Sequence, residues 1–374
     1  MRSHPTPARF PLAVNASILG RAPSGLGQYA RGLVRALDSL REGLIVYTPC
    51  PEAFSGLRAA MRRTSSFTRP ELGVKGHVAR LLWCQTALRA RLHRDDPGAL
   101  LNTLPEGVLR CRVPQITVVH DLIPLAFPRD FPRQQLYFRR LVPAILRESR
   151  AVVAVSEATR RAVLAAYGLR PERVRTIPNG YDRTRFTPIG PANEEGGVPY
   201  VLHVGNLLPH KNLPRLIEAV ARVAKETAVR LIIAGGGPPA RAADLRSRAD
   251  RVGVRLELMP YVPPRDLPAL YRGARLLAMP SLAEGFGLPA LEAMACGTPV
   301  IVGDTSAMPE VVGDAGLLVD PADTAAIADA VLCLLTQDSL RKELIARGLA
   351  RAAEFSWERA ARQMLMVLDE VAAS

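Results

Sequence analysis

Residues 281–300 read Ser281-Leu-Ala-Glu-Gly-Phe-Gly-Leu-Pro-Ala-Leu-Glu-Ala-Met-Ala-Cys-Gly-Thr-Pro-Val300 and place two carboxylates, Glu284 and Glu292, around the expected start of a helix. Pro289 suits the first turn of that helix because its missing N–H would be unpaired there anyway. Gly287 lies in the loop that enters the helix, where a glycine allows the backbone to approach a ligand closely. The free N–H groups and the positive dipole end of a helix start favour an anion. An anion held there, with a hydroxyl-binding carboxylate on either side, indicates a sugar nucleotide.

On both sides of this stretch, short β-branched runs alternate with amphipathic helical stretches, which predicts an α/β fold with mainly parallel sheets. The strands expected in the first half are Leu12–Asn15, Leu44–Thr48, Ala99–Asn102, Gln115–His120, Ala151–Ser156 and Arg173–Ile177. Those expected in the second half are Tyr200–Val204, Arg230–Ala234, Val254–Leu258, Arg275–Met279, Pro299–Val302 and Gly316–Val319. The helices expected in the first half are Gly27–Leu40, Val78–Leu92, Gln134–Glu148 and Glu157–Gly168, and a last helix is expected at Trp357–Ala372.

The chain has 374 residues, which favours two domains over a single hydrophobic core. The stretch Thr184–Tyr200 is rich in Gly and Pro and lacks periodicity, so we expect it to be the linker. Two doubly wound domains joined there would face each other across a cleft, with ligands beyond the carboxyl ends of the strands. We place the domain bounds at residues 1–185 and 186–355, followed by the closing helix at 356–374.

The composition is that of a globular protein, with 48% hydrophobic and 22% charged residues. No signal sequence or membrane-spanning run is evident, and the five cysteines show no metal or redox spacing, so we expect a cytoplasmic protein. Residues 1–190 carry 30 Lys or Arg and 13 Asp or Glu, whereas residues 191–374 carry 19 and 22. This asymmetry favours an anionic partner for the first half: a membrane surface, such as the cytoplasmic face of the inner membrane, a phosphorylated lipid or a nucleic acid. A genome rich in Arg would also produce it.

Several loops that follow the expected strands carry residues suited to phosphate or sugar binding. Gly25-Leu26-Gly27 opens the first helix, His120-Asp121 ends a strand, and Gly205-Asn206 precedes Lys211. Taken singly, each motif is as compatible with a tight turn, a hydrogen-bonded strand-end His or a surface Lys as with a ligand site. Their joint position at strand ends of both halves favours a ligand site.

These motifs resemble those of the retaining glycosyltransferases of family 4, which have the GT-B fold of two Rossmann-like domains. The similarity covers nearly the whole chain. The stretches that carry it are Gly25-Leu-Gly27, His120-Asp-Leu-Ile-Pro124, Val155-Ser-Glu157, Pro178-Asn-Gly180, Gly205 with Lys211-Asn212, and Glu284-Gly-Phe-Gly-Leu-Pro-Ala-Leu-Glu292. The chain looks most similar to bacterial polysaccharide mannosyl- and rhamnosyltransferases, which share the His-Asp-Leu-Ile-Pro stretch.

The resemblance implies a role for each motif. Glu292 would hold the ribose of the donor nucleotide, and Glu284 would contact the hexose. The N–H groups of Gly287 and Leu288, together with Lys211, would face the diphosphate, and His120 would lie beside the transferred sugar. The Gly25–Gly27 segment would close on the diphosphate from the first domain, and the last helix would cross back onto that domain.

The resemblance also implies no metal and no cofactor beyond the donor substrate, because the helix dipole and a basic side chain would stabilise the diphosphate. One position departs from the pattern: Asn206 stands where many relatives carry Arg, so Lys211 would lack its usual partner cation. His210 is the candidate to replace it.

We therefore expect a retaining hexosyltransferase that moves a mannose- or rhamnose-like sugar from a nucleotide diphosphate to a glycan or a lipid-linked glycan. The alternative is a basic α/β protein that binds nucleic acid or a membrane without transferase activity. Nucleic acid is disfavoured because aromatic residues are only 5% of the chain and no binding motif is evident. The basic, amphipathic stretch His77–Arg94, which includes Trp83, is compatible with peripheral membrane attachment and fits an ordinary surface helix slightly better. A dinucleotide-dependent oxidoreductase lacks its three-glycine fingerprint here.

Overall fold

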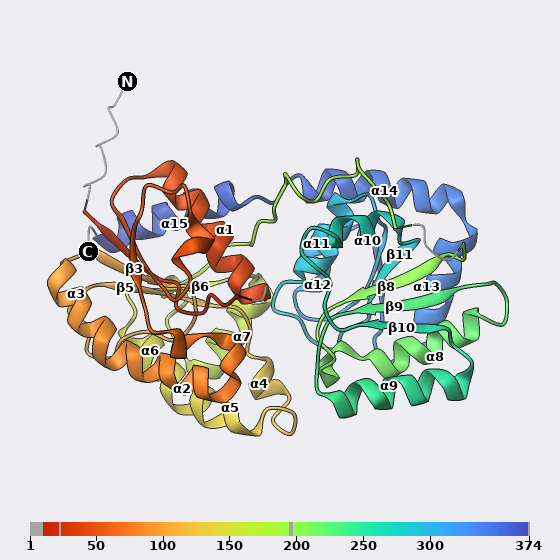
Figure 1. The fold of residues 1–374 in the computed structure, drawn as a ribbon, viewed down its shortest axis with the longest axis horizontal. Coiled ribbons are helices and arrows are strands. Elements are labelled where there is room, and N and C mark those ends of the chain that lie inside the picture. The colour runs from red at the N-terminus through yellow and green to blue at the C-terminus, as the bar shows by residue number, and fades with distance from the viewer. Residues whose placement is uncertain (1–9, 22–23, 194–196, 373–374) are drawn as a thin grey trace. The chain divides into compact units, whose positions relative to one another are not determined.

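The computed structural model describes residues 10–21, 24–193 and 197–372. Its contacts divide the chain into two compact units (Figure 1). Unit 1 comprises Met1–Gly180 and Ser356–Ser374, and unit 2 comprises Tyr181–Phe355. The functional domains expected from the sequence, residues 1–185 and 186–355 with a closing helix at 356–374, remain a prediction. Three residues of the expected linker, 194–196, lie outside the described residues.

Unit 1 is built on a parallel sheet of seven strands in the order β3-β2-β1-β4-β5-β6-β7. The strands are β1 (Leu12–Asn15), β2 (Leu44–Thr48), β3 (Ala60–Arg63), β4 (Ala99–Asn102), β5 (Gln115–Val119), β6 (Ala151–Ala154) and β7 (Val174–Thr176). The α-helices are α1 (Gly25–Leu40), α2 (Gly73–Trp83), α3 (Arg89–Asp95), α4 (Ile123–Ala126), α5 (Pro132–Leu136), α6 (Val142–Glu148), α7 (Glu157–Tyr167) and α15 (Trp357–Ala372). The shorter helical turns are η1 (Pro51–Phe54), η2 (Ser66–Thr68), η3 (Pro70–Leu72), η4 (Cys84–Leu88), η5 (Tyr137–Leu141) and η6 (Pro171–Arg173).

Unit 2 is built on a parallel sheet of six strands in the order β10-β9-β8-β11-β12-β13. The strands are β8 (Tyr200–Val204), β9 (Arg230–Ala234), β10 (Leu256–Met259), β11 (Leu276–Met279), β12 (Val300–Gly303) and β13 (Leu317–Val319). The helices are η7 (Pro209–Lys211), α8 (Leu213–Val223), α9 (Pro239–Val252), α10 (Leu267–Gly273), α11 (Leu288–Ala295), α12 (Met308–Val312), α13 (Thr324–Thr336) and α14 (Asp338–Ala352). Apolar residues of α8 and α13 form the core with the sheet.

These two parallel, doubly wound sheets confirm the expected α/β class. The expected strands are present within two residues of their predicted bounds, and most of them are short, buried, apolar runs. The strands β7, β10 and β13 are only partly buried. Strand β3 was missed because its sequence Ala-Met-Arg-Arg is mostly exposed at the sheet edge and lacks apolar alternation. In each sheet the strand order reverses at one point, between β1 and β4 in unit 1 and between β8 and β11 in unit 2. Such switch points are where ligands bind in this class of fold.

Two helical predictions for unit 1 need correction. The helices expected at 78–92 and 134–148 begin earlier, and a π-helical turn interrupts each of them, at η4 and at η5. The Gly25–Gly27 segment is not a loop but the first turn of α1. The Ser24 hydroxyl caps that turn by accepting a hydrogen bond of 3.1 Å from the N–H of Gly27.

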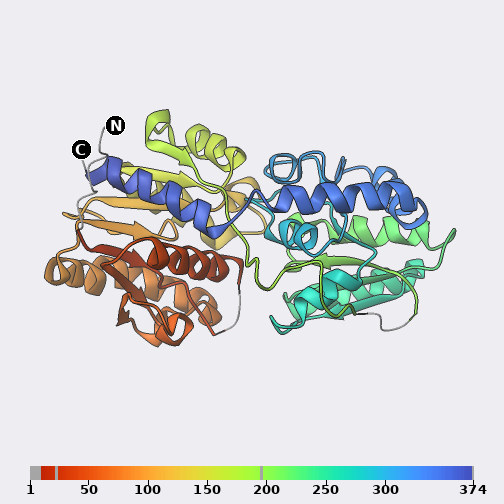
Figure 2. The same ribbon diagram turned by 90° about the horizontal axis from the view of Figure 1, so that it is seen from above.

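The last helix, α15, packs against α1 within unit 1, as the side-by-side ribbons in Figure 2 show. The Trp357 ring makes an edge contact with Tyr29, with 5.6 Å between centroids. A Cβ atom at Gly32 would lie 2.3 Å from the Trp357 ring, so this close packing requires glycine on α1. Among the residues that the structure describes, no helix combines the length and the apolar character needed to cross a membrane.

Candidate donor-binding site

The switch point of unit 2 brings Lys211 and Glu284 together. Lys211 follows β8 and Glu284 follows the neighbouring strand β11, so parallel pairing puts both loops at the same edge of the sheet. The Lys211 ammonium donates to the Glu284 carboxylate at 2.6 Å, and the two side chains are only 11% and 9% exposed. Burial raises the pKa of Glu284, but Lys211, with smaller effects from Ser281 and His210, brings this pKa below its ordinary value. The two residues therefore form a buried ion pair.

The two loops are fastened to each other by bonds that fix this pair. Asn212 adopts a left-handed conformation with φ +60°, and its side-chain amide donates to the carbonyl of Pro280 at 3.0 Å. The N–H of Leu282 donates to the carbonyl of His210 at 2.7 Å. The N–H of Glu284 donates to the hydroxyl of Ser306 at 2.8 Å, so a third loop, after β12, also supports the site. Lys211 thus supplies the cation, and the adjacent Asn212 supplies the hydrogen bond that holds its loop to the loop after β11.

The glycines of this edge permit close approach of the loops. A Cβ atom at Gly235 would lie 1.9 Å from the carbonyl oxygen of Gly205, so the loops after β9 and β8 touch through their backbones. Gly287 has φ +97°, a left-handed conformation that other residues adopt only with strain, and its missing side chain leaves room for Met308. A glycine is therefore required where the chain turns into α11.

Glu292 lies about one turn inside α11, as expected, and is 9% exposed. Tyr271 donates its phenolic hydrogen to Glu292 at 3.0 Å. Burial raises the pKa of Glu292 to about 7, and the nearby Arg185 and the Tyr271 bond offset this shift only in part. Additional hydrogen-bond donors, such as the hydroxyls of a ribose, would stabilise the ionised form of Glu292.

Asn206 lies at the exposed side of the turn after Gly205. Its side chain is exposed, and its oxygen accepts a hydrogen bond of 3.3 Å from the N–H of Leu208, which stabilises the turn after Gly205. His210 is buried at 4% exposure in the same turn. A residue that the sequence motifs did not reveal is His203, inside β8. It is fully buried, and its Nδ1 donates to the carbonyl of Ala278 at 2.9 Å.

In unit 1, His120 directly follows β5, which ends one residue earlier than expected, and its ring is fixed on two sides. Its Nε2 donates to the carbonyl of Thr103 at 2.8 Å, and Tyr29 of α1 makes an edge contact with 4.5 Å between ring centroids. Burial lowers the pKa of His120 to about 4, so the imidazole is neutral at physiological pH. With the proton on Nε2, Nδ1 is a hydrogen-bond acceptor. The first turn of α1, with Gly25, Leu26 and Gly27, lies one turn from Tyr29.

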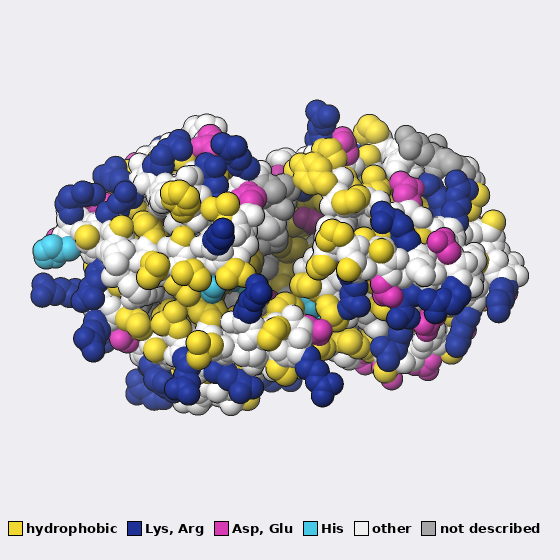
Figure 3. Space-filling view, turned by 60° about the horizontal axis from the view of Figure 1, so that its bottom comes forward, with side chains coloured by type: hydrophobic (Ala, Val, Ile, Leu, Met, Phe, Trp, Pro, Cys, Tyr) yellow, Lys and Arg dark blue, Asp and Glu magenta, His cyan; other side chains and the backbone are white. Residues whose placement is uncertain are grey.

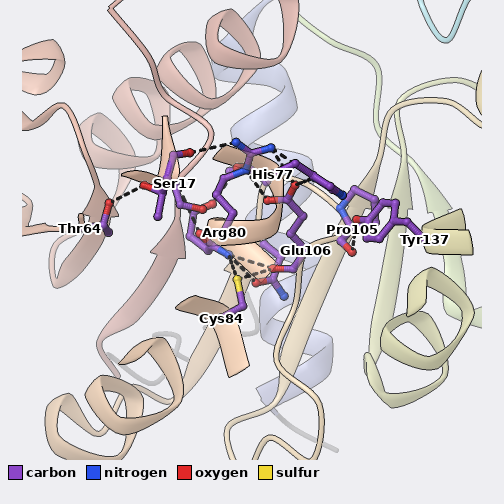
Figure 4. A network of polar contacts seen from close by, with 12 residues as sticks. Ser17, Thr64, His77, Arg80, Cys84, Pro105, Glu106 and Tyr137 are labelled. Atoms are coloured by element: carbon purple, nitrogen blue, oxygen red, sulfur yellow. Dashed lines mark hydrogen bonds and ion pairs between the residues drawn. The ribbon is translucent and has the colours of Figure 1, made fainter. Parts of the chain in front are cut away.

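The switch point of unit 1 holds a second buried ion pair, which the sequence motifs did not reveal (Figure 4). Glu106, in the loop after β4, accepts hydrogen bonds from Arg80 at 2.7 and 3.1 Å and contacts Nδ1 of His77 at 3.0 Å. Burial raises the pKa of Glu106, but His77 and Arg80 together bring it below its ordinary value. The Tyr137 hydroxyl donates to the carbonyl of Pro105 in the same loop. This cluster fixes the loop after β4.

Within the described residues, no three or more His, Cys, Asp or Glu side chains are grouped so as to hold a metal ion.

Comparisons with known proteins agree with this geometry. Residues 23–185 match the family model "Glycosyltransferase Family 4", and residues 188–351 match "Glycosyl transferases group 1". The O-antigen chain mannosyltransferase B of Escherichia coli is 34% identical over 263 residues, which are 67% of this chain and 68% of that protein. The chain is a glycosyltransferase with the GT-B fold. It belongs to the family that includes bacterial polysaccharide mannosyltransferases.

Other relatives of this glycosyltransferase act on different substrates. A D-inositol 3-phosphate glycosyltransferase of Corynebacterium efficiens is 33% identical over 280 residues, 69% of this chain and 66% of that protein. The solved structure of Anabaena Alr3699/HepE in complex with UDP-glucose superposes with a TM-score of 0.74 at 19% identity, covering 96% of this chain and all of that one. The structural likeness confirms the fold, while the sequence relatives differ in acceptor.

Proposed function

We propose that this glycosyltransferase transfers a hexose, with mannose or a rhamnose-like sugar favoured, from a nucleotide diphosphate sugar to a glycan or lipid-linked glycan, with retention. The observation that carries the proposal is the buried Lys211–Glu284 pair at the switch point of unit 2, beside the N-terminus of α11. A buried cation with one carboxylate partner can exchange that partner for a diphosphate. The exchange would free Glu284 to accept hydrogen bonds from hydroxyls of the hexose.

The other residues take roles that fit their surroundings. Glu292 accepts hydrogen bonds from the ribose hydroxyls, and the N–H groups of Gly287 and Leu288 face the diphosphate. His120, neutral and oriented by Thr103, accepts a hydrogen bond from the transferred sugar through Nδ1. The first turn of α1, with Gly25, Leu26 and Gly27, contacts the diphosphate.

The reaction follows a front-face path. The bond between the anomeric carbon and the diphosphate oxygen breaks while the acceptor hydroxyl attacks from the same face, and the proton of that hydroxyl passes to the departing oxygen. The protein contributes mainly stabilisation of the leaving diphosphate by Lys211 and the helix dipole. No paired-carboxylate geometry of the glycosidase kind is needed for this path.

The proposal is tested first by a thermal-shift screen against GDP-, UDP-, dTDP- and ADP-sugars. A donor that binds the folded protein raises its melting temperature by mass action. The shift should be present in wild type and small in Lys211→Ala and Glu292→Gln. A shift of equal size in all three proteins would contradict the assignment of these residues.

An inositol phosphate is a second candidate acceptor, favoured by the likeness to D-inositol 3-phosphate glycosyltransferases. Once the donor is known, transfer to D-inositol 3-phosphate and to short mannose oligosaccharides should be compared in the same assay. Product from the oligosaccharide alone supports the polysaccharide assignment, and product from the inositol phosphate alone replaces it.

A further inference from the structure

Unit 1 carries an apolar patch, which we define as Phe67, Leu72, Val74, Val78, Leu82 and Leu136. Their exposed fractions are 71, 45, 52, 47, 62 and 71%. Soluble proteins rarely gather so many large apolar side chains on one surface without a partner for them. The candidate donor site, which lies in unit 2, does not account for these exposed apolar side chains of unit 1.

The patch is continuous because its elements pack on one another. Val74, Val78 and Leu82 recur every four residues and therefore lie along one side of α2. The turns η2 and η3, which carry Phe67 and Leu72, pack against the same helix. A Cβ atom at Gly76 would lie 2.2 Å from the carbonyl oxygen of Arg69, so glycine allows this close approach.

The helix α5 adds Leu136 to this surface. The neighbouring Tyr137 makes an edge contact with His77 of α2, with 4.8 Å between ring centroids. Figure 3 shows hydrophobic side chains gathered on this face of the unit, bordered by Lys and Arg. Trp83, which lies on the stretch that the sequence offered for membrane attachment, is 7% exposed and packs in the core of unit 1.

The charge around the patch is predominantly positive, although the exposed Glu71 lies next to Leu72. Residues 73–94 and 132–141 contain eight Lys or Arg and no Asp or Glu. Exposed members of this set flank the apolar side chains on both helical segments: Lys75, Arg89, Arg133, Arg139 and Arg140. Long basic side chains can lay their stems along an apolar surface while their charges reach outward to anions.

We propose that the apolar patch is a docking surface for a bilayer that contains anionic lipids. The apolar side chains insert at the boundary between headgroups and acyl chains, and the flanking cations contact lipid phosphates. The surface belongs to the same helix as His77 and Arg80, which hold the loop after β4, so docking brings the carboxyl edge of the unit 1 sheet close to the lipid headgroups. This inference does not depend on which sugar the enzyme transfers.

The test is co-sedimentation of the full chain with vesicles of pure phosphatidylcholine and with vesicles in which half the lipid is phosphatidylglycerol. Wild type should bind the anionic vesicles, and added salt should weaken but not abolish the binding, because screening acts on the charges and not on the inserted apolar groups.

Two triple variants separate the contributions. Phe67→Ser/Leu82→Ser/Leu136→Ser should weaken binding to anionic vesicles by more than about tenfold, since it removes apolar area that insertion would bury. Lys75→Gln/Arg133→Gln/Arg140→Gln should also weaken it and should reduce its salt dependence. The matched control, Ile189→Ser/Tyr261→Ser/Leu318→Ser, removes exposed apolar side chains from unit 2 and should bind like wild type.

Circular dichroism and the donor thermal shift establish that each variant is folded. The proposal is overturned if folded wild type fails to bind anionic vesicles, or if the apolar variant binds them as tightly as the control. It is also overturned if wild type self-associates in sedimentation velocity without lipid and the apolar variant is monomeric, because the patch would then be an interface between two copies.

Discussion

The switch points of the two units each contain a buried acid paired with a base, and the two pairs are built differently. In unit 1, Glu106 is held by two hydrogen bonds from Arg80 and a third contact from His77. In unit 2, Glu284 meets Lys211 through one hydrogen bond from a primary ammonium. The planar guanidinium of Arg80 makes two hydrogen bonds to Glu106, whereas the ammonium of Lys211, at the end of a flexible side chain, makes one to Glu284.

Under the proposed function, the difference separates a structural pair in unit 1 from a ligand-binding pair in unit 2. Arg80 also donates to the carbonyl of Thr68 at 2.9 Å, so it ties α2 to η2 as well as to the loop after β4. Lys211 lies beside glycine loops and the start of α11, where a diphosphate can compete for its charge. A fully satisfied network rigidifies its surroundings, and a pair with a single contact can open for a ligand. The following predictions, in order of decreasing effect, test this contrast.

Arg80→Ala should lower the free energy of unfolding of unit 1 by about 3–5 kcal/mol, because it leaves Glu106 buried without its main partner. Urea denaturation followed by circular dichroism measures the change. The control is Arg63→Ala, whose pair with Glu52 is exposed on both sides and should cost at most about 1 kcal/mol. Equal stability of the two variants would refute the structural role of the pair.

Lys211→Ala should lower kcat/KM by about 10²–10³-fold, because it removes the charge that stabilises the leaving diphosphate. Initial rates with the donor from the thermal-shift screen measure this loss. Lys225→Ala, which removes an exposed lysine of the same unit, should keep wild-type activity. If the two variants differed by less than threefold, the Lys211–Glu284 pair would be a structural pair like that of unit 1.

Glu292 should make the stability of unit 2 decline as the pH rises from about 4.5 to about 7. The folded state raises the pKa of Glu292 to about 7 and keeps its proton in this range, whereas the unfolded chain has released it. The contribution is full below the unfolded pKa and is lost as the pH rises through the folded one, with a size on the order of 3 kcal/mol.

Melting curves of wild type and Glu292→Gln at pH 4.5, 6 and 7.5 measure this contribution. The glutamine variant should lack the decline, while Glu218→Gln, at an exposed acid of the same unit, should keep it. A decline of the same size in Glu292→Gln would assign it to another group.

His77→Phe should lower the stability of unit 1 by about 1 kcal/mol, because it removes one hydrogen bond to Glu106 and keeps a ring against Tyr137. Urea denaturation under the conditions used for Arg80→Ala gives the comparison. A loss as large as that of Arg80→Ala would mean that His77, and not Arg80, is the main partner of Glu106.

The sequence predicted the parts of the fold that depend on local patterns. Buried strands such as Tyr200–Val204 are short apolar runs, and the last helix has clear amphipathic spacing, so the bounds of both were predicted without error. Gly287 and Pro289 marked the start of α11 because each has a local backbone preference. The motifs after the strands also led to the correct family.

Only the tertiary structure decided which side chains meet. Lys211 and Glu284 are 73 residues apart and meet because parallel strands bring their loops to one edge of a sheet. Arg80 and Glu106 are 26 residues apart and meet because α2 packs beside the loop after β4. The same holds for burial: Trp83 and Leu82 are neighbours in sequence, yet the first lies in the core and the second on the surface. Local preferences set the strands and helices, whereas pairing and exposure depend on contacts between segments far apart in the chain.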